Sequence, residues 1–325
     1  MHMKQQIIGV TGAAGFIGSH LCEKLLRSGS KVIAVDNLSK GSKTNIRKLL
    51  KDKNFKFYKA DITDPNTAKK LFSNLDIVVH LAGAKIPRYG GRLETLNINT
   101  EGTKNILEAI KKNKTKFIFA STSDVYGKNP NLPFSEDSDL VIGSSEVARW
   151  SYAVSKIFDE QLCYAYWEKY KVPFVILRLF GIYGPKQHRT WRGGPQAIFI
   201  DRIMSEQEIE IHGNGEQTRT FIYIDDLVEA IIKSVSSKKA INQIINIGTS
   251  HEISIIGLAK LIAKLVNKPL KIKKIPYQSF TGMKYEDVKR RTPVITKAKT
   301  LLNWEPKMSL EDGLLETINW QSKTK

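Results

Sequence analysis

Apolar runs of four to seven residues recur along the first half of the chain, each followed by a longer segment with apolar residues three or four positions apart. The runs are typical of strands buried on both faces, and the longer segments of amphipathic helices. The runs lie at residues 7–10, 31–35, 55–58, 76–80, 116–120 and 173–179. This alternation predicts an α/β fold with a doubly wound parallel sheet, helices on both faces, and ligands bound beyond the carboxyl ends of the strands.

After about residue 180 the pattern changes to shorter elements. The expected elements are a loop over 181–194, a helix near 197–204, strands near 210 and over 220–223, a strand over 243–247, and helices over 255–266 and 310–322. We expect the strand over 243–247 to return to the main sheet. Residues 1–180 are therefore predicted to form the sheet domain, and residues 181–325 a smaller C-terminal lobe that covers its binding edge.

Three glycines follow the first apolar run, at Gly12, Gly15 and Gly18, and a helical pattern begins directly after them. In a Rossmann fold, the first glycine allows the turn, the second lets the backbone approach a pyrophosphate, and the third packs helix against strand. The new helix directs its free N–H groups and its positive end at the phosphates. Three spaced glycines alone could also form an ordinary turn.

The second predicted strand ends in Asp36, 18 residues after the last of these glycines. An acid at this place accepts hydrogen bonds from the adenosine ribose and repels a 2′-phosphate, which favours NAD over NADP. The alternative is a solvated carboxylate at a strand end. Asp61 follows the third strand and is placed either for the adenine amino group or to cap the helix at Pro65. The residues expected to bind the cofactor are Gly12, Gly15, Phe16, Ile17, Gly18, Asp36, Asn37, Ser39, Asp61, Ile62, Leu81, Ala82, Gly83, Asn99, Ser121, Tyr152 and Lys156.

Tyr152 and Lys156 are four residues apart in a predicted helix, so their side chains share one face. The ammonium of a lysine beside a phenol lowers the pKa of the phenol, and the positive charge of NAD adds to this effect. Tyr152 could then remove a hydroxyl proton while the nicotinamide takes hydride from the same carbon. The Tyr-x-x-x-Lys pattern also occurs by chance, but the glycine motif and the hydroxyl cluster at 121–124 favour this chemistry.

Together these motifs resemble the extended short-chain dehydrogenases/reductases, in the group of NAD-dependent nucleotide-sugar epimerases, dehydratases and decarboxylases. The resemblance covers nearly the whole chain. It rests on Thr-Gly-Ala-Ala-Gly-Phe-Ile-Gly18, Val-Asp36-Asn-Leu-Ser, His-Leu-Ala82-Gly, Ser-Thr122-Ser-Asp-Val-Tyr-Gly127, Tyr152-Ala-Val-Ser-Lys156, Gly181-Ile-Tyr-Gly-Pro185 and the segment 213–226.

The resemblance implies roles for individual residues. Thr122 would bond the 4-hydroxyl of the sugar, and Lys156 the nicotinamide ribose. Arg219 would bind the diphosphate, unless it only forms a surface salt bridge. Arg291 would lie on the substrate side, where Arg290 or a plain charged loop is the alternative. The expected substrate contacts are Lys85, Thr122, Gly181, Arg192, Gln196, Arg219 and Arg291; Lys85, Arg88 and Arg192 could meet a sugar carboxylate or could be solvated.

Members of this group first oxidise C4 of the sugar and differ in the chemistry after that step. The 4,6-dehydratases carry Asp-Glu after the threonine, whereas this chain has Ser123-Asp124, which disfavours dehydration. Decarboxylases of UDP-glucuronate carry Ser-Glu there together with an arginine like Arg291, and the segment beginning Arg149-Trp150 also resembles bacterial decarboxylases. Asp124 is one methylene shorter than that glutamate. A 4-epimerase needs neither acid.

We therefore expect a 4-epimerase of a UDP-hexose or UDP-hexuronate, with Thr122, Ser123, Asp124, Tyr152 and Lys156 in the catalytic set. UDP-glucuronate decarboxylation, a 4,6-dehydratase or a reductase are the enzymatic alternatives. An NAD-binding sensor or scaffold is the non-enzymatic one, and the intact Thr122, Tyr152 and Lys156 argue against it. The resemblance also implies a homodimer formed through the helices predicted at 93–112 and 152–169.

Composition narrows the setting of this chemistry. The chain has 325 residues, 41% of them apolar and 26% charged, and no apolar run approaches the ~18 residues of a membrane-spanning helix. Because the first predicted strand begins near residue 7, we expect no signal peptide, and the presence of only Cys22 and Cys163 suits a reducing cytoplasm. Neither cysteine has metal-ligand spacing, so both are expected in the core and no metal site is predicted.

The net charge of +19 raises the possibility of a nucleic-acid partner. The excess is mostly lysine, which we expect to be scattered over helix surfaces, as at 111–114 and 271–274. The sequence contains no basic helix with base-reading side chains and no aromatic stacking module. We therefore predict no specific nucleic-acid partner, and a charge that attracts an acidic substrate such as a nucleotide-sugar.

Overall fold

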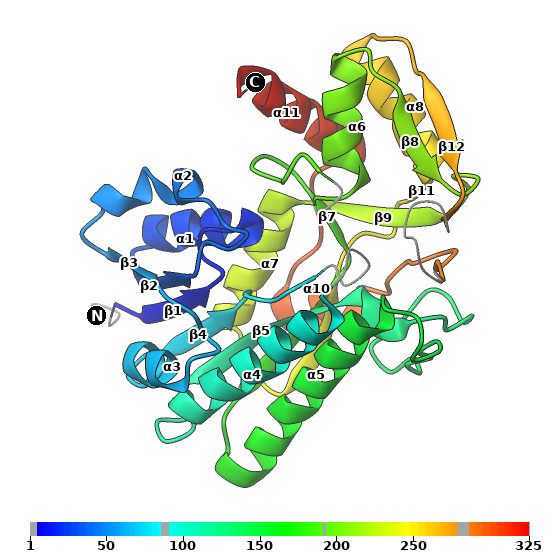
Figure 1. The fold of residues 1–325 in the computed structure, drawn as a ribbon. Coiled ribbons are helices and arrows are strands. Elements are labelled where there is room, and N and C mark those ends of the chain that lie inside the picture. Colours follow the sequence, from blue (N-terminus) through cyan, green and yellow to red (C-terminus); the bar gives the residue numbers. More distant parts are fainter. Residues whose placement is uncertain (1–4, 86–90, 191–192, 278–285, 325) are drawn as a thin grey trace.

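A sheet of seven parallel strands forms the centre of the protein (Figure 1). The computed structural model describes residues 5–85, 91–190, 193–277 and 286–324. The strands of the sheet are β1 (Ile7–Thr11), β2 (Lys31–Asp36), β3 (Phe55–Lys59), β4 (Ile77–His80), β5 (Lys116–Thr122), β6 (Phe174–Leu179) and β10 (Gln243–Ile247). Their order is β10-β6-β5-β4-β1-β2-β3, so the chain winds outward in both directions from β1. The doubly wound fold is confirmed, and the crevice between β1 and β4 is where such sheets bind ligands.

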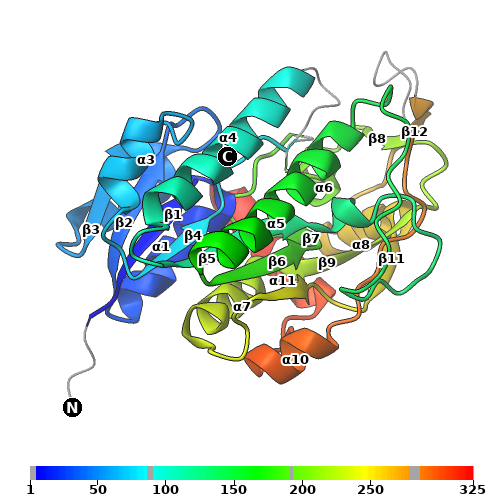
Figure 2. The same cartoon turned by 90° about the horizontal axis from the view of Figure 1, so that it is seen from below.

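Side chains of the inner strands alternate between two apolar cores, one on each face of the sheet. In β5, Ile118 enters the first core, whereas Phe117 and Phe119 enter the second. The first face is covered by α1 (Phe16–Arg27) and α7 (Ile224–Ser236), and the second by α3 (Pro65–Phe72), α4 (Arg92–Ile110) and α5 (Trp150–Tyr170), as Figure 2 shows. Burial on both faces explains why these strands read as apolar runs.

Most of the remaining elements gather at the carboxyl ends of the strands. They are β7 (Gly181–Tyr183), α6 (Pro195–Met204), β8 (Ile209–His212), β9 (Thr218–Tyr223), β11 (Glu252–Ser254), α8 (Ile255–Val266), β12 (Ile272–Ile275) and α11 (Leu310–Lys323). Helix α10 (Thr296–Leu302) instead packs against β10 and α7 on the first face of the sheet. Strands β11, β9 and β7 form one small sheet, and β12 pairs with β8 in another. These two sheets with α6 and α8 lie at the upper right of Figure 1, beyond the carboxyl ends of the main sheet.

One predicted strand lies where it was expected, whereas several other elements differ from the prediction. The strand over 243–247 does return to the main sheet, where Ile245 of β10 pairs with Leu177 of β6. The expected loop at 181–194 begins instead with β7, because its backbone pairs with β9. Residues 272–275 form β12 rather than a helix surface, with the side chains of Lys273 and Lys274 exposed. Between β2 and β3 the chain forms a short α2 (Lys43–Ile46) followed by one 3₁₀ turn.

Helix α7 was not predicted, although it belongs to the framework of the sheet. Leu227, Val228 and Ile231 of α7 join the same core as Leu21 and Leu25 of α1. A helix from the second half of the chain therefore covers the sheet formed mainly by the first half. Within the four described ranges, no helix is long and apolar enough to cross a membrane. Cys22 and Cys163 are buried free thiols.

Candidate active site

A cavity of about 490 Å³ lies beyond the carboxyl ends of β1, β4, β5 and β6, and the small sheets form its other wall. It brings together residues from both halves of the chain. Of the predicted site residues, it is lined by Gly12, Gly15, Phe16, Ile17, Gly18, Leu81, Lys85, Thr122, Ser123, Asp124, Tyr152, Gly181, Gln196, Arg219 and Arg291. Arg192 and Arg88 lie outside the described residues.

The glycine loop at one end of this cavity has no room for side chains. Gly12 adopts φ +66° in the left-handed region, and a Cβ on Gly18 would lie 2.1 Å from the Gly12 carbonyl oxygen. Gly15 precedes α1 and has no side chain with which to bond the first N–H groups of that helix. These groups therefore remain available to an anion, and together with the helix dipole they fit a pyrophosphate.

Asp36 stands beside this loop at the end of β2. Its carboxylate accepts hydrogen bonds from the backbone N–H groups of Ala14, at 2.9 Å, and Leu38, at 2.8 Å. Each carboxylate oxygen can accept a second bond, so ribose hydroxyls can still be bound. Asp61 accepts bonds from Asn37 and from Thr63, and the cap of α3 is Asp64 instead. The alternative role of Asp61 as that cap is thus taken by another residue.

Other predicted cofactor residues lie behind the wall of the cavity. Asn99 bonds both the N–H and the carbonyl of Ala84, and so holds the loop after β4. Ser121 donates to the buried Glu160, which forms an ion pair with Arg178. The cavity lining also does not include Asp36, Asn37, Ser39, Asp61, Ile62, Ala82, Gly83 or Lys156.

Tyr152 and Lys156 lie one turn apart near the start of α5, and both are largely surrounded by protein. The Lys156 ammonium donates to the Ala120 carbonyl at 3.0 Å and lies 4.4 Å from the centre of the Phe119 ring. Burial lowers the pKa of Lys156, which the charge of Asp159 opposes. Burial and the negative charge of Asp124 raise the pKa of the Tyr152 phenol. This direction is opposite to the expected one, because burial and the Asp124 charge, both of which oppose ionisation of the phenol, are the largest influences on it.

Thr122 ends β5 and begins the turn that carries Asp124. Its hydroxyl accepts a bond from the Asp124 backbone N–H at 3.2 Å and donates to the Asp124 carboxylate at 3.3 Å. The Thr122 hydroxyl and the Asp124 carboxylate therefore hold each other, and both line the cavity together with Tyr152.

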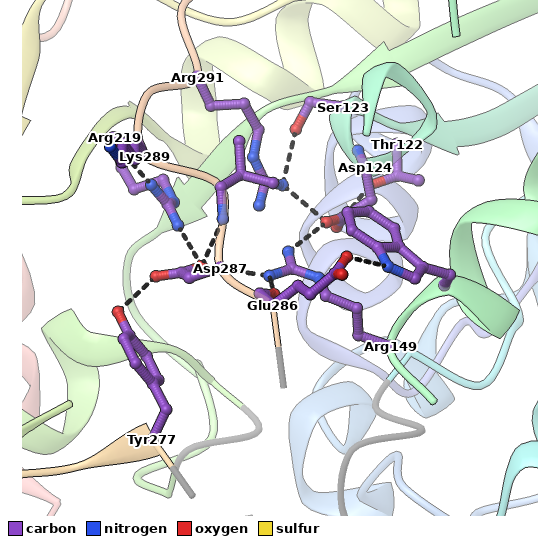
Figure 3. Close-up of polar contacts among 12 residues, drawn as sticks. Thr122, Ser123, Asp124, Arg149, Arg219, Tyr277, Glu286, Asp287, Lys289 and Arg291 are labelled. Carbon is purple, nitrogen blue, oxygen red and sulfur yellow. Dashed lines mark hydrogen bonds and ion pairs between the residues drawn. The ribbon is translucent and has the colours of Figure 1, made fainter. Parts of the chain in front are cut away.

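Five charged residues form a continuous series of ion pairs along the cavity, in the order Arg219, Asp287, Arg149, Asp124, Arg291 (Figure 3). We call this series the ion-pair chain. Asp287 Oδ1 lies 3.0 Å from Arg219 and 3.1 Å from Arg149. Asp124 Oδ1 lies 3.1 Å from Arg149 and 2.9 Å from Arg291. Positive and negative side chains alternate, so each acid lies between two guanidinium groups.

Both acids of the ion-pair chain are ionised at neutral pH. Burial raises the pKa of Asp287, but Arg219 and Arg149 outweigh burial and lower it to about 2. Burial likewise opposes ionisation of Asp124, yet Arg291 and Arg149 hold its pKa well below the usual range. Burial lowers the pKa of Arg291 to about 10, which leaves it charged. Three cations and two anions leave the ion-pair chain with one excess positive charge, which suits a polyanionic substrate.

The structure shows where the arginines lie for which the sequence left alternatives open. Arg290 is exposed and paired with Glu252 at 2.7 Å, whereas Arg291 lines the cavity. Arg219 is paired with Asp287 inside the cavity rather than at the outer surface. Gly181 has no space for a larger residue, since a Cβ there would lie 2.5 Å from the Thr220 carbonyl oxygen.

Three lining residues of this network were missed as site residues. Arg149 stands directly before α5, and its sequence signals were its place three residues before Tyr152 and the resemblance of its segment to bacterial decarboxylases. Asp287 lies in the same segment as Arg291 and could have been considered as its acidic neighbour. Tyr277, whose hydroxyl donates to Asp287 at 2.6 Å, follows β12 and carries no sequence signal that we can identify.

The fold, the glycine loop and the Tyr152–Lys156 pair define an enzyme of the short-chain dehydrogenase/reductase type. The sequence model of the NAD dependent epimerase/dehydratase family matches residues 8–248. The chain belongs to this family, and its cofactor is NAD.

Related proteins carry more than one activity. The chain is 39% identical over 321 residues to a UDP-N-acetyl-alpha-D-glucosaminuronate decarboxylase of Bacillus cytotoxicus, covering 98% of each chain. It is 36% identical to a UDP-glucuronate 4-epimerase of Thermodesulfobacterium geofontis, covering 97% of this chain and 95% of that one. The crystal structure of the UDP-glucuronic acid 4-epimerase of Bacillus cereus with UDP-glucuronic acid and NAD superposes with a TM-score of 0.88 at 32% identity, covering 98% and 100% of the two chains.

Proposed function

We propose that the protein is an NAD-dependent decarboxylase of a UDP-linked hexuronate, which oxidises C4 of the sugar and then releases its carboxyl group as carbon dioxide. The observation that carries this proposal is the grouping of Ser123, Asp124 and Arg291 beside Tyr152 and Thr122 in one cavity. The relative from Bacillus cytotoxicus, a decarboxylase of an acidic UDP-sugar, supports the same reaction.

The cofactor would be held by the glycine loop and by the first turn of α1 at its pyrophosphate, by Asp36 at the adenosine ribose, and by Lys156 at the nicotinamide ribose. When bound, NAD would supply the acceptor for the hydride that leaves C4 of the sugar. Binding would place the hydroxyls of that ribose near the Lys156 ammonium, which has three donor hydrogens and directs one of them to the Ala120 carbonyl.

Tyr152 would take the proton of the 4-hydroxyl as hydride leaves the same carbon. Its pKa is raised by burial and by Asp124, so ionisation of the phenol must be favoured by nearby positive charge. Lys156 and the bound cofactor supply this charge. Thr122, fixed by its two bonds to Asp124, would bond the same hydroxyl and orient it toward Tyr152.

Oxidation at C4 turns a hexuronate into a β-keto acid, which loses carbon dioxide readily. The bond between C5 and the carboxyl carbon breaks, its electron pair moves toward O4, and C5 then takes a proton. Tyr152, protonated in the first step, and Thr122 would donate hydrogen bonds to O4 as negative charge develops there.

The charge state of Asp124 favours this outcome. Asp124 is ionised and already forms an ion pair with Arg291 at 2.9 Å. A substrate carboxylate in this corner would lie beside another negative charge, and like charges at short range destabilise each other. Release of neutral carbon dioxide moves the charge to O4 and relieves the repulsion.

A UDP-hexuronate 4-epimerase is the second candidate; the sequence alone favoured a 4-epimerase of either a UDP-hexose or a UDP-hexuronate. It is supported by the 4-epimerases among the related proteins. The size of the cavity, about 490 Å³, also suits a ketone that must turn over before hydride returns to its other face.

Proton NMR with NAD separates these reactions when UDP-glucuronate, UDP-N-acetylglucosaminuronate and UDP-glucose are given in separate tubes. We expect a UDP-pentose or a 4-keto-pentose from one of the acids and no product from UDP-glucose, which is the neutral control. A galacto-configured hexuronate would establish the 4-epimerase instead. Conversion of UDP-glucose alone would contradict both acidic substrates.

We also propose a homodimer formed through α4 and α5. Three large apolar side chains on these helices are exposed, with Leu93 at 71%, Val154 at 45% and Phe158 at 50% of their surface. Phe158→Asp should dissociate such a dimer, which light scattering coupled to size-exclusion chromatography would detect as a halved mass. A monomeric wild-type protein would contradict the proposal.

A further inference from the structure

The ion-pair chain connects the two ends of the substrate cavity. Arg219 comes from β9 and is the residue proposed to bind the diphosphate. Asp124 and Arg291 lie at the other end, beside Thr122. Asp287 and Arg149 join these ends, and all of them line the same cavity (Figure 3).

Asp287 occupies the place where an anionic substrate group would meet Arg219. Its Oδ1 accepts from Arg219 Nη2 at 3.0 Å, from Arg149 Nη1 at 3.1 Å and from the Val288 backbone N–H at 2.9 Å. Its Oδ2 accepts from the Tyr277 hydroxyl at 2.6 Å. Carboxylate and phosphate oxygens present the same kind of acceptor to a guanidinium group. A diphosphate that binds Arg219 therefore competes with a carboxylate that is already there.

We propose that Asp287 is an internal counter-ion that the substrate diphosphate replaces on Arg219, and that Arg149 transmits this exchange to Asp124. The inference rests on the proposed function, in which Arg219 binds the diphosphate. Asp287 and Arg149 are thereby positioning residues, since they act on the reacting sugar through Asp124.

The transmission follows from the way in which Arg149 is shared. Its Nη1 contacts Asp287 and its Nη2 contacts Asp124. When a diphosphate binds Arg219, Asp287 loses its ion pair with Arg219. Arg149 is then the remaining cation paired with Asp287 in the ion-pair chain, so the Arg149–Asp287 pair becomes stronger. A stronger Arg149–Asp287 pair weakens the hold of Arg149 on Asp124, which then depends on Arg291. Binding of a diphosphate at Arg219 thus changes the electrostatic environment of Asp124, which lies beside the sugar.

The exchange also provides selectivity. Arg219 already has a partner, so a weak anion such as inorganic phosphate gains little by displacing Asp287. A nucleoside diphosphate gains contacts along its whole length and can offset the loss of that ion pair.

UDP binding to the NAD-loaded protein, measured by isothermal titration calorimetry, tests the exchange without any turnover. Replacing the competing carboxylate in Asp287→Asn should tighten UDP binding about fivefold, at the lower end of typical coupling between linked sites. Turnover of the UDP-hexuronate should fall in the same variant, because Arg149 has lost one anchor. A residue with a purely structural role would not tighten UDP binding while it slows turnover.

Glu286→Gln is the matched control for charge. It removes a negative charge one residue away, but its carboxylate bonds the Trp150 indole N–H at 2.9 Å and Lys128 at 3.2 Å rather than Arg219. We expect a change in UDP affinity of less than about twofold, since the charge is not paired with the diphosphate site. In an Arg219→Met background, Asp287→Asn should no longer change the affinity for UDP.

Unchanged or weaker UDP binding in Asp287→Asn would overturn the exchange, as would equal tightening in Glu286→Gln. Tightening that persists in Arg219→Met would overturn the assignment to Arg219. If Asp287→Asn does not fold, Tyr277→Phe removes the hydroxyl that holds Oδ2 and should tighten UDP binding modestly; weaker binding would then overturn the exchange. Failure of the wild-type protein to bind UDP would overturn it as well. Failure to decarboxylate a UDP-hexuronate would instead overturn the proposed function alone.

Discussion

The two ends of the active-site cavity bind anions by different means. The cofactor end uses the backbone: a glycine turn and the first turn of α1, both within residues 12–18. The substrate end uses the five charged side chains of the ion-pair chain, which come from separate parts of the sequence. Anion binding at the cofactor end therefore depends on the shape of the backbone, and anion binding at the substrate end depends on the charges of side chains.

This difference determines how each end responds to change. Backbone N–H groups keep their partial charges at every pH, but a single added methyl group can block the approach of a phosphate. Paired side chains tolerate small changes in shape, whereas the loss of one charge leaves its neighbours uncompensated. Substitutions at the cofactor end should therefore act by blocking the approach of a phosphate, and substitutions at the substrate end by leaving charges unpaired. Tyr152 lies between the two ends.

The largest effect is expected at Tyr152, on which both ends converge. Tyr152→Phe removes the proposed base without changing the shape of the side chain. Turnover should fall by about a thousandfold, within the range for loss of a general base. UDP and NAD affinities should stay within about twofold, because neither the backbone nor the charged end is altered. Steady-state kinetics with calorimetry checks both, and substantial remaining turnover would mean that another group accepts the proton.

Asp124→Asn removes a charge at the substrate end while it leaves the shape of the side chain nearly unchanged. The amide can still accept a bond from the Thr122 hydroxyl, but the repulsion of the substrate carboxylate is lost. Carbon dioxide release should slow by about a hundredfold, comparable to the loss of one electrostatic group in an active site. Release measured with carboxyl-labelled substrate checks this. A rate equal to that of the wild type would show that the Asp124 charge has no part in the reaction.

Gly18→Ala should show the sensitivity of the cofactor end to shape. The new Cβ would lie 2.1 Å from the Gly12 carbonyl oxygen, whereas Gly15→Ala places one 3.1 Å from the same atom. We expect Gly18→Ala to destabilise the fold by about 2–3 kcal/mol through overpacking, and Gly15→Ala by less. Thermal unfolding and NAD titration separate the effects, since Gly15→Ala should weaken NAD binding in a protein that is still folded. Equal stability of the two variants would contradict the steric argument.

The ion-pair chain should make stability depend on acid pH. The pKa of Asp287 is lowered to about 2 in the folded protein from an ordinary value of 3.8. A depressed carboxyl pKa contributes stability that is present above the unfolded value and is lost as pH falls from about 4 toward 2. The contribution amounts to about 2 kcal/mol. Urea unfolding at pH 6 and pH 3 should show a smaller loss for Asp287→Asn than for the wild type, and equal losses would contradict the pairing.

The smallest effect is expected at Asp36, which belongs to the cofactor end but acts through its charge. Asp36→Ala should weaken NAD binding about tenfold and reduce the discrimination against NADP, because a hydrogen-bonding carboxylate is lost. It should also lower stability, since the N–H groups of Ala14 and Leu38 lose their acceptor. Titration with both cofactors checks the first point. An unchanged preference would remove Asp36 from the ribose site.

The same contrast explains what the sequence could predict. The glycine loop and Asp36 lie within one strand–helix–strand unit, so residue types and spacing alone indicate their role. The ion-pair chain is assembled by contacts between segments up to 167 residues apart, as for Arg291 and Asp124. No local pattern marks Asp287 as a partner of Arg219, or Tyr277 as a partner of Asp287. Arg219 and Arg291 themselves were recognised only through the family resemblance.

The differences in the fold have similar causes. Strands β7 and β11 have three residues each, too few for a period to be visible. Helix α7 is a different case, because Leu227, Val228 and Ile231 have helical spacing after two acids, a signal that was overlooked. The direction of the Tyr152 pKa shift could not be predicted, since it depends on the burial of Tyr152 and on the position of Asp124.

The proposed reaction requires that C4 oxidation in this cavity leads to loss of the sugar carboxylate. Its sharpest test is ¹³C NMR of the wild-type protein with NAD and UDP-hexuronates labelled at the carboxyl carbon, UDP-glucuronate and UDP-N-acetylglucosaminuronate in turn. We expect the label of one of them to move to carbon dioxide and bicarbonate as a UDP-pentose or 4-keto-pentose appears. Label retained in a hexuronate of inverted C4 configuration would contradict decarboxylation and establish the 4-epimerase.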